Sequence, residues 1–258
     1  MILSPTSTKI QSIYNPDVTY VTTDEPAESV GRIMQKYDLV AIPVVDSIGR
    51  LVGRITIDDV VDVIREEAEK DYQMMSGISQ DVESSDTIWD QTKARLPWLI
   101  IGLFGGMLAA YMISFYEADI ALFPATAMFI PVITAMGGNV GIQSSAIVVK
   151  GLASNTLTSK NILQSISKEI SCAVINACIC SSIIFILSLC FNLTSLAMPI
   201  TVTISLFIVI MFASMFGTAF PLLLNKLKID PALATGPFIT LTNDIIGLNI
   251  YLFTGKAI

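Results

Sequence analysis

The second half of this 258-residue sequence is a succession of long apolar stretches, and this feature most restricts what the chain can fold into. A helix crosses a bilayer with about 20 apolar residues, and only helices and closed barrels satisfy their backbone polar groups in lipid. Hydrophobic residues make up 53% of the chain and charged residues only 14%, as is typical of a membrane protein. The sequence predicts five transmembrane helices, over residues 97–116, 119–150, 170–190, 199–224 and 234–255.

The loops between these stretches predict an orientation. Lysine and arginine fall on one side of a five-helix arrangement, at Lys93, Arg95, the 150–168 loop and the 225–228 loop, whereas the loops of the other side have none. Because positively charged loops stay in the cytoplasm, we expect a multi-pass protein of the cell inner (plasma) membrane. Its N-terminal half is then cytoplasmic, and its helices contact membrane lipid.

Composition excludes several activities. The sequence has no histidine, which removes HExxH metalloproteases and histidine-based acid–base chemistry, and it has no GxxxxGK[ST] loop of a P-loop ATPase. The formal net charge of −7 disfavours nucleic acid, because no basic stripe is available to neutralise phosphates, and it favours cations. We therefore expect neither an enzyme nor a nucleic-acid partner.

Residues 18–70 have the pattern of a small α/β unit. The runs DVTYV, LVAIPVV and RLVGRITI predict strands, and EPAESVGRIMQKY and DDVVDVIREEAEK predict helices, in the order β-α-β-β-α. The segment VTTDEPAESVGRIMQKYDLVAIPVVDSIGRLVGRITIDDVVDVI resembles a CBS domain. CBS domains act as tandem pairs, and one complete copy fits here, so we expect the first copy to be missing.

Three domains are therefore predicted in a mainly α-helical polytopic membrane protein with five transmembrane helices and an N-terminal α/β CBS domain. They are a cytosolic CBS domain (1–70), a connecting, plug-like helix with an interfacial segment (71–95), and a transmembrane pore domain (96–258). Trp89 and Trp98 flank the basic pair of the interfacial segment, as is typical of residues at headgroup depth.

The second apolar stretch is longer than one span needs and contains the segment GGNVG. Gly137, Gly138 and Gly141 weaken a membrane helix, and freed backbone groups are tolerated at that depth only where protein or water satisfies them. One interpretation is a broken helix that lines a cavity, to which Asn139 and Gln143 add amide oxygens. The other is close helix packing through small residues, because Gly137 and Gly141 form a GxxxG pair.

The fifth apolar stretch holds one carboxylate, Asp244, near its middle. Such a charge costs on the order of 3 kcal/mol at the bilayer centre and usually faces water, a partner or an ion. No lysine, arginine or histidine lies near the centre of a span to pair with it, so the alternative is a protonated, packed aspartic acid. Thr240, Thr242 and Asn243 add oxygen atoms of the kind that a hard cation prefers.

Three parts of the sequence together resemble the MgtE family of magnesium transporters and channels, and the resemblance covers essentially the whole chain. They are the CBS unit, PVITAMGGNVGIQSSAIVVKGLA and DPALATGPFITLTNDIIGLNIYL. The resemblance implies a homodimer with a central pore between the second and fifth spans, and Asp244 of each subunit at the ion site. The pore-lining candidates are Gly138, Asn139, Gln143, Thr240 and Asn243. The N-terminal helical domain of the family matches no part of the sequence, so we expect it to be missing as well.

The function that follows is passage of hydrated Mg²⁺, with Co²⁺ or another divalent cation as a further cargo. Mg²⁺ gives up its waters reluctantly, so a wide ring of oxygens binds it through its hydration shell. The absence of an ATPase motif favours channel-like flow. The alternative is a non-conducting regulatory or degenerate membrane subunit that binds Mg²⁺.

The resemblance also implies a cytosolic Mg²⁺ sensor that closes the pore. Its best candidates are Glu28, Asp38, Asp59, Asp62 and Glu67. For any one of these acids, a solvated acidic face is the simpler interpretation. Thr56 and Asp59 also fit the TxxD pattern that contacts ribose in nucleotide-binding CBS domains. ATP is therefore a further candidate ligand, and this candidate rests on four residues alone.

Overall fold

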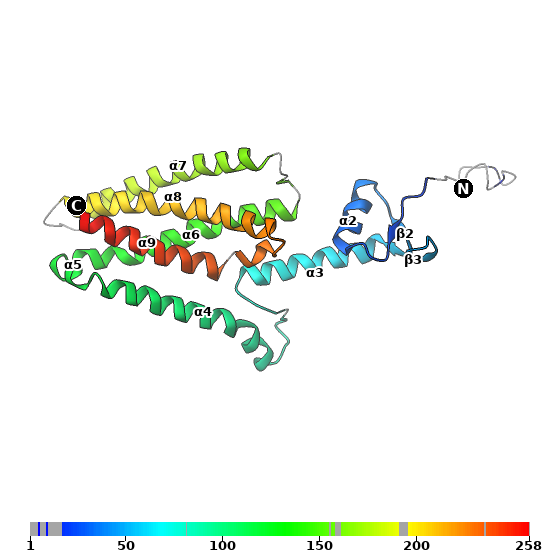
Figure 1. Ribbon diagram of the computed structural model, residues 1–258, viewed down its shortest axis with the longest axis horizontal. Coiled ribbons are helices and arrows are strands. Elements are labelled where there is room, and N and C mark those ends of the chain that lie inside the picture. The colour runs from blue at the N-terminus through cyan, green and yellow to red at the C-terminus, as the bar shows by residue number, and fades with distance from the viewer. Residues whose placement is uncertain are drawn as a thin grey trace. The chain divides into compact units, whose positions relative to one another are not determined.

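The structure is a computed structural model that describes residues 5, 9, 17–80, 82–154, 156–157, 161–190, 196–234 and 236–257. The side chains of Glu28, Ala234 and Ala257 lie outside that description. The chain divides into two compact units, Met1–Glu69 and Lys70–Ile258. Figure 1 shows the elements of both.

The first unit is a three-stranded sheet with helices. Strand β1 (Val21–Thr22) pairs in parallel with β2 (Ala41–Val45), and β2 pairs in antiparallel fashion with β3 (Leu51–Thr56). Helix α2 (Ala27–Lys36) connects β1 to β2, and α3 (Ile57–Met75) follows β3 and ends in the second unit. The predicted β-α-β-β-α order is therefore confirmed.

Apolar side chains from the sheet, α2 and the start of α3 form the core of this unit. They are Val21, Val30, Met34, Ile42 and Val60. Val30 and Met34 lie four residues apart, so the helical period brings both onto the face of α2 that packs in the core. At the turn between β2 and β3, Asp46 Oδ1 accepts from the Ile48 and Arg50 backbone N–H groups at 3.0 and 2.8 Å.

The second unit is helical. Its elements are α4 (Ile88–Ser114), α5 (Glu117–Leu122), α6 (Ala125–Ala153), α7 (Ile162–Leu189), α8 (Ala197–Lys226), the short 3-10 helix η1 (Pro231–Ala234) and α9 (Pro237–Ala257). In the part of the chain that the structure describes, α4, α6, α7 and α8 are long and apolar enough to cross a membrane. The protein is therefore a mainly helical membrane protein.

Helix α9 covers the fifth predicted span but is not among those four helices. Its 21 residues include Thr240, Thr242, Asn243, Asp244 and Asn249, which lower its hydropathy. It packs on α6, α8 and α4. Polar residues are tolerated in a membrane helix where other helices or water satisfy them, and the membrane crossing of α9 stays a prediction.

Helix α8 lies at the centre of the helical unit. It packs on α6, α7 and α9, and α4 packs on α9 at the edge (Figure 1). Val209 and Ile210 of α8 join Leu248 of α9 in the buried core. Helices α4 and α7 instead expose large apolar side chains such as Leu103 and Ile186, as is typical of helices that contact lipid.

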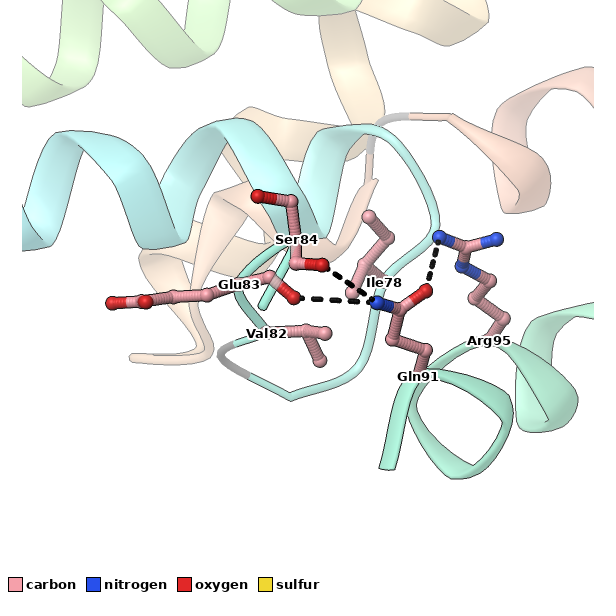
Figure 2. Close-up of a pocket in the computed structure, with 6 residues that line it drawn as sticks. All are labelled: Ile78, Val82, Glu83, Ser84, Gln91 and Arg95. Carbon is pink, nitrogen blue, oxygen red and sulfur yellow. Dashed lines mark hydrogen bonds between the residues drawn. The ribbon is translucent and has the colours of Figure 1, made fainter. Parts of the chain in front are cut away.

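Two glutamine side chains order the segment between α3 and α4. Gln73 Nε2 donates to the Val82 carbonyl oxygen and Gln73 Oε1 accepts from the Val82 N–H, both at 3.1 Å. The Gln91 amide nitrogen points toward the carbonyl oxygens of Glu83 and Ser84, each at 3.4 Å, beside a cavity of about 330 Å³ (Figure 2). These bonds satisfy backbone groups that neither helix can reach.

Helix α4 begins earlier than the first predicted span. Thr87 is its N-cap, and Thr87 Oγ1 accepts from the Asp90 N–H at 3.3 Å. The helix then continues through Pro97. The predicted interfacial segment is thus the first part of α4, where Lys93 Nζ lies 5.8 Å from the centre of the Trp89 ring.

Helix α6 is continuous, so the predicted interruption at GGNVG is wrong. Gly137, Gly138 and Gly141 are buried within the helix. A side chain at Gly141 would overlap the Asn243 amide, and one at Gly217 would overlap the Gly141 carbonyl oxygen. The glycines therefore allow α6 to pack closely on α8 and α9, which is the second interpretation of the motif.

Tyr251 ties α9 to the start of α6. Its side chain is fully buried, and its hydroxyl donates to the Thr126 carbonyl oxygen at 3.0 Å. Tyr251→Phe loses this hydrogen bond, so we expect the free energy of unfolding to fall by about 1 kcal/mol. Unfolding in detergent, followed by circular dichroism, measures the change. Tyr111→Phe is the matched control, since Tyr111 is 61% exposed; equal stability of Tyr251→Phe and the parent protein would contradict the assigned bond.

Candidate functional site

Asp244 and Thr240 lie one turn apart on α9 and line the same cavity. The cavity has a volume of about 490 Å³ and is bordered by Gly102 and Gly106 of α4 and by Ile142 of α6. Residues four apart on a helix share a face, which is why the carboxylate and the hydroxyl meet there. The structure thus brings two of the predicted ion-site residues together.

Gly138 of α6 leaves room for the Asp244 carboxylate. A methyl group at position 138 would lie 3.3 Å from Asp244 Oδ1 and 3.0 Å from Thr240 Cγ2. Both distances are shorter than ordinary contacts between carbon and its neighbours. Helix α6 therefore approaches α9 closely at the level of the carboxylate because residue 138 has no side chain.

Among the described residues, Asp244 has no cationic partner and no hydrogen-bond donor. The salt bridges of the described helices lie elsewhere, as with Lys256 Nζ and Asp119 Oδ2, which are 3.8 Å apart. A carboxylate inside a membrane bundle requires water, a cation or a partner. Asp244 is therefore available to a ligand from the cavity.

Asn243, a predicted pore-lining residue, is buried beside α6 and is not among the residues that line this cavity. Its side chain is 1% exposed, and neither Oδ1 nor Nδ2 has a hydrogen-bond partner within the described part of the chain. An unpaired buried amide costs roughly 1–3 kcal/mol. Adjacent helix residues point about 100° apart, so Asn243 and Asp244 face different neighbours.

Asn139 and Gln143 lie one turn apart on an exposed face of α6. Neither lines the cavity around Asp244 within a single chain. Lipid offers no hydrogen bonds, so amide side chains on a membrane helix face water or another protein surface. The single chain therefore leaves a polar face of α6 uncovered.

Two of the predicted sensor acids, Asp59 and Asp38, have a structural role near a helix end. Asp59 Oδ2 accepts from Thr56 N at 2.9 Å and from Thr56 Oγ1 at 2.6 Å, so the third residue of α3 reaches back to the residue before the helix, as in one half of a capping box. The hydroxyl and then the backbone hydrogen bond lower the pKa of Asp59. The stability that these two bonds contribute is therefore fully present above the ordinary aspartate pKa and is lost as the pH falls through the lowered pKa of Asp59. Asp38, two residues after the end of α2, has a left-handed backbone with φ +51° that aspartate tolerates.

The remaining sensor candidates are spread over the first unit. Asp62 is exposed and Glu67 is half-buried, both on α3, and the Glu28 side chain lies outside the described residues. Within the described chain, no three Asp, Glu or Cys side chains come together as a group that could hold a metal ion. The pair Thr56 and Asp59, predicted to contact a ribose, is engaged with itself.

Glu169 is a half-buried acid whose role the sequence patterns did not reveal. It lies early in α7, and its Oε1 accepts from Ser144 Oγ at 2.6 Å and from Ser214 Oγ at 2.8 Å. The apolar stretch that predicts the third span starts at residue 170, so hydropathy alone leaves this acid outside the membrane helix. An acid adjoining an apolar stretch was the available signal.

Two families match the chain. Residues 10–66 match the CBS domain, and residues 130–254 match MgtE, described as a divalent cation transporter. The magnesium transporter MgtE of Bacillus subtilis is 36% identical over 257 residues, which cover 100% of this chain and 57% of the relative. The chain belongs to the MgtE family.

Other MgtE relatives agree. The magnesium transporter MgtE of Thermus thermophilus is 31% identical over 264 residues, covering 100% of this chain and 57% of the relative. That of Enterococcus faecalis is 34% identical over 251 residues, covering 97% of this chain and 55% of the relative. The chain thus spans little more than half the length of these relatives, all of which are named as transporters.

The MgtE match contains the whole candidate ion site. Gly138, Asn139 and Gln143 of α6, and Thr240 and Asp244 of α9, all lie within residues 130–254. The CBS match ends at residue 66 and contains four of the five sensor candidates. These four are Glu28, Asp38, Asp59 and Asp62.

Proposed function

We propose that this MgtE-family chain carries Mg²⁺ across the membrane through a pore between two copies of the chain. The proposal rests on the Asp244 carboxylate, which is unpaired among the described residues and lines a cavity of about 490 Å³. Helix α9 packs on α6, whose exposed face carries Asn139 and Gln143. A second copy related by a two-fold axis would cover this polar face and enclose water beside it.

The chemistry of the site suits a hydrated divalent cation. Two symmetry-related Asp244 carboxylates offset the charge of one Mg²⁺, and the hydroxyl and amide oxygens of Thr240, Asn139 and Gln143 accept hydrogen bonds from its waters. An all-oxygen site distinguishes ions by size and hydration, so Co²⁺ and other divalent cations are further candidate cargoes. Relatives of 31–36% identity are named magnesium transporters.

The loop charges support an orientation in the cell inner membrane with the N-terminal half in the cytoplasm. With α9 as the fifth span, α4 would run outward, and the start of α9 would lie on the cytoplasmic side. The Lys256–Asp119 pair would then lie at the outer face. Uptake of Mg²⁺ into liposomes that contain only the purified chain tests the function. A chain that binds Mg²⁺ without moving it would instead be a regulatory subunit.

We further propose that the end of α3 is a plug-like element that closes the pore when cytosolic Mg²⁺ is high. Met75 and Ser76 border the same cavity as Asp244. Any side chain at Gly236, before α9, would overlap the Met75 carbonyl oxygen, so α3 ends directly against the start of α9. Mg²⁺ bound by the acids of the cytosolic unit would screen their mutual repulsion and favour the closed arrangement.

Free Mg²⁺ is expected to slow trypsin cleavage at Arg65 and Lys70 of α3, because an α3 held in the closed arrangement opens less often to the protease. Timed digestion of the purified chain, read by mass spectrometry, measures the rate at each site. The control is the same ionic strength supplied by a monovalent salt, which screens charge without binding. A cleavage rate that is the same with and without Mg²⁺ would count against this gating.

A further inference from the structure

Glu169 joins three helices through one carboxylate oxygen. Its Oε1 accepts from Ser144 Oγ of α6 at 2.6 Å and from Ser214 Oγ of α8 at 2.8 Å, and the two hydroxyls are 3.2 Å apart. Ser144 is 3% exposed and Ser214 is 1% exposed. Both hydroxyls are thus removed from water, and each is satisfied by its hydrogen bond to the Glu169 side chain.

The three side chains lie beside the closest approach of α6 to α8. Ser144 follows Gly141 by one turn, and Ser214 precedes Gly217 by one turn. A side chain at Gly217 would overlap the Gly141 carbonyl oxygen, so the two backbones are in contact there. The Glu169 bonds therefore hold α6 at the level where it has almost no freedom to shift along α8.

The same stretch of α6 shapes the surroundings of Asp244. Gly138 lies six residues before Ser144, and a methyl group there would be 3.3 Å from Asp244 Oδ1. A rotation of α6 about its axis would replace Gly138 with a neighbouring side chain against the carboxylate. The rotation of α6 is set on its α8 side by Ser144, which donates to Glu169 Oε1 and whose Oγ lies 3.2 Å from Ser214 Oγ.

We propose that Glu169 is a positioning residue for ion passage, which, through Ser144 and Ser214, holds α6 in the rotation that keeps Gly138 against Asp244. The inference rests on the proposed function of the Asp244 site. Glu169 itself does not line the Asp244 cavity. It acts on α6 through Ser144, about 120° around the helix from Gly138. Its removal therefore changes the geometry of the ion site without removing any of its ligands.

The test uses Glu169→Gln, which keeps the shape but removes the charge, and the double variant Ser144→Ala/Ser214→Ala. We expect each to raise the Mg²⁺ concentration for half-maximal flux into liposomes by about 3- to 10-fold, the size of coupling through packed elements. Because all three side chains act as one unit, the triple variant should show the same shift as Glu169→Gln alone. Ser182→Ala is the matched control, since within the described part of the chain the Ser182 hydroxyl bonds only in its own helix, to the Cys178 carbonyl oxygen.

Amide hydrogen exchange of α6 peptides provides a readout that needs no transport. Faster exchange around residues 137–145 is expected in Glu169→Gln and in the double serine variant, but not in Ser182→Ala. An unchanged half-saturating concentration with unchanged exchange would overturn the positioning role, as would additive effects of the two sets of substitutions. If exchange changes as expected while Asp244→Ala still transports Mg²⁺, the proposed ion site is wrong, whereas the Glu169 contacts that hold α6 are supported.

Discussion

Asp244→Ala is expected to abolish Mg²⁺ uptake by magnesium-starved cells that depend on this chain for the ion. The substitution removes the only carboxylate among the described residues that border the α4–α6–α9 cavity, so a divalent cation inside the membrane loses its counter-charge. Such a cation is then held by hydroxyl, amide and water oxygens alone, and its desolvation is no longer offset. Uptake should fall to the level of cells without the protein, as measured by total cell Mg²⁺ over time.

Three variants separate charge from shape at this site. Asp244→Asn keeps the volume and removes the charge, so it should fail like Asp244→Ala, whereas Asp244→Glu should retain part of the uptake. Thr254→Val is the matched control on the same helix, because among the described residues the Thr254 hydroxyl bonds only to the Ile250 carbonyl oxygen of α9. Undiminished uptake by Asp244→Asn, with expression equal to the parent, would refute the ion-site assignment.

Gly217→Ala is expected to give a large loss of stability for the addition of a single methyl group to the bundle. The added methyl group would overlap the Gly141 carbonyl oxygen, and a backbone atom in a continuous helix cannot turn aside as a flexible side chain can. Overpacking usually costs about 1–3 kcal/mol and occasionally more, and contact with backbone places this variant at the upper end. Unfolding in detergent, with the recovery of monodisperse protein after extraction, measures the effect.

Gly106→Ala is the matched control for this substitution. Gly106 also lies within a membrane helix, but no atom of another described residue lies where its methyl group would go. Alanine is the better helix former, so stability should be unchanged or slightly raised. Equal stability of Gly217→Ala and Gly106→Ala would show that α6 and α8 are not in backbone contact at Gly141.

The fold of the first unit and the positions of the apolar helices could be predicted because they rest on local patterns. The β-branched run of the β2 segment and the 3.6-residue period of α2 are visible in the sequence, and long apolar stretches leave few alternatives in lipid. Helix α4 begins before the predicted apolar span because hydropathy detects only the apolar part of a helix. The cap at Thr87 begins α4 ten residues before Pro97.

The candidate site could be predicted in part. Asp244 stands out in the sequence because a lone carboxylate in an apolar stretch is costly. The sequence does not show which neighbour shares its cavity, since Asn243 and Thr240 are both polar and close, and only the packing of α6 separates them. The glycines of GGNVG were ambiguous for the same reason, because their contacts with Gly217 and Asn243 come from far along the chain. The role of Glu169 could not be predicted from the sequence, because its two serine partners lie on other helices.

Recording across a planar lipid bilayer, with the purified chain as the sole protein and Mg²⁺ as the sole cation, tests the ion-site proposal most directly. We predict a Mg²⁺ current from the parent chain that disappears in Asp244→Asn. A chain that carries no Mg²⁺ current in this setting, or an Asp244→Asn variant that carries the same current as the parent, would contradict it.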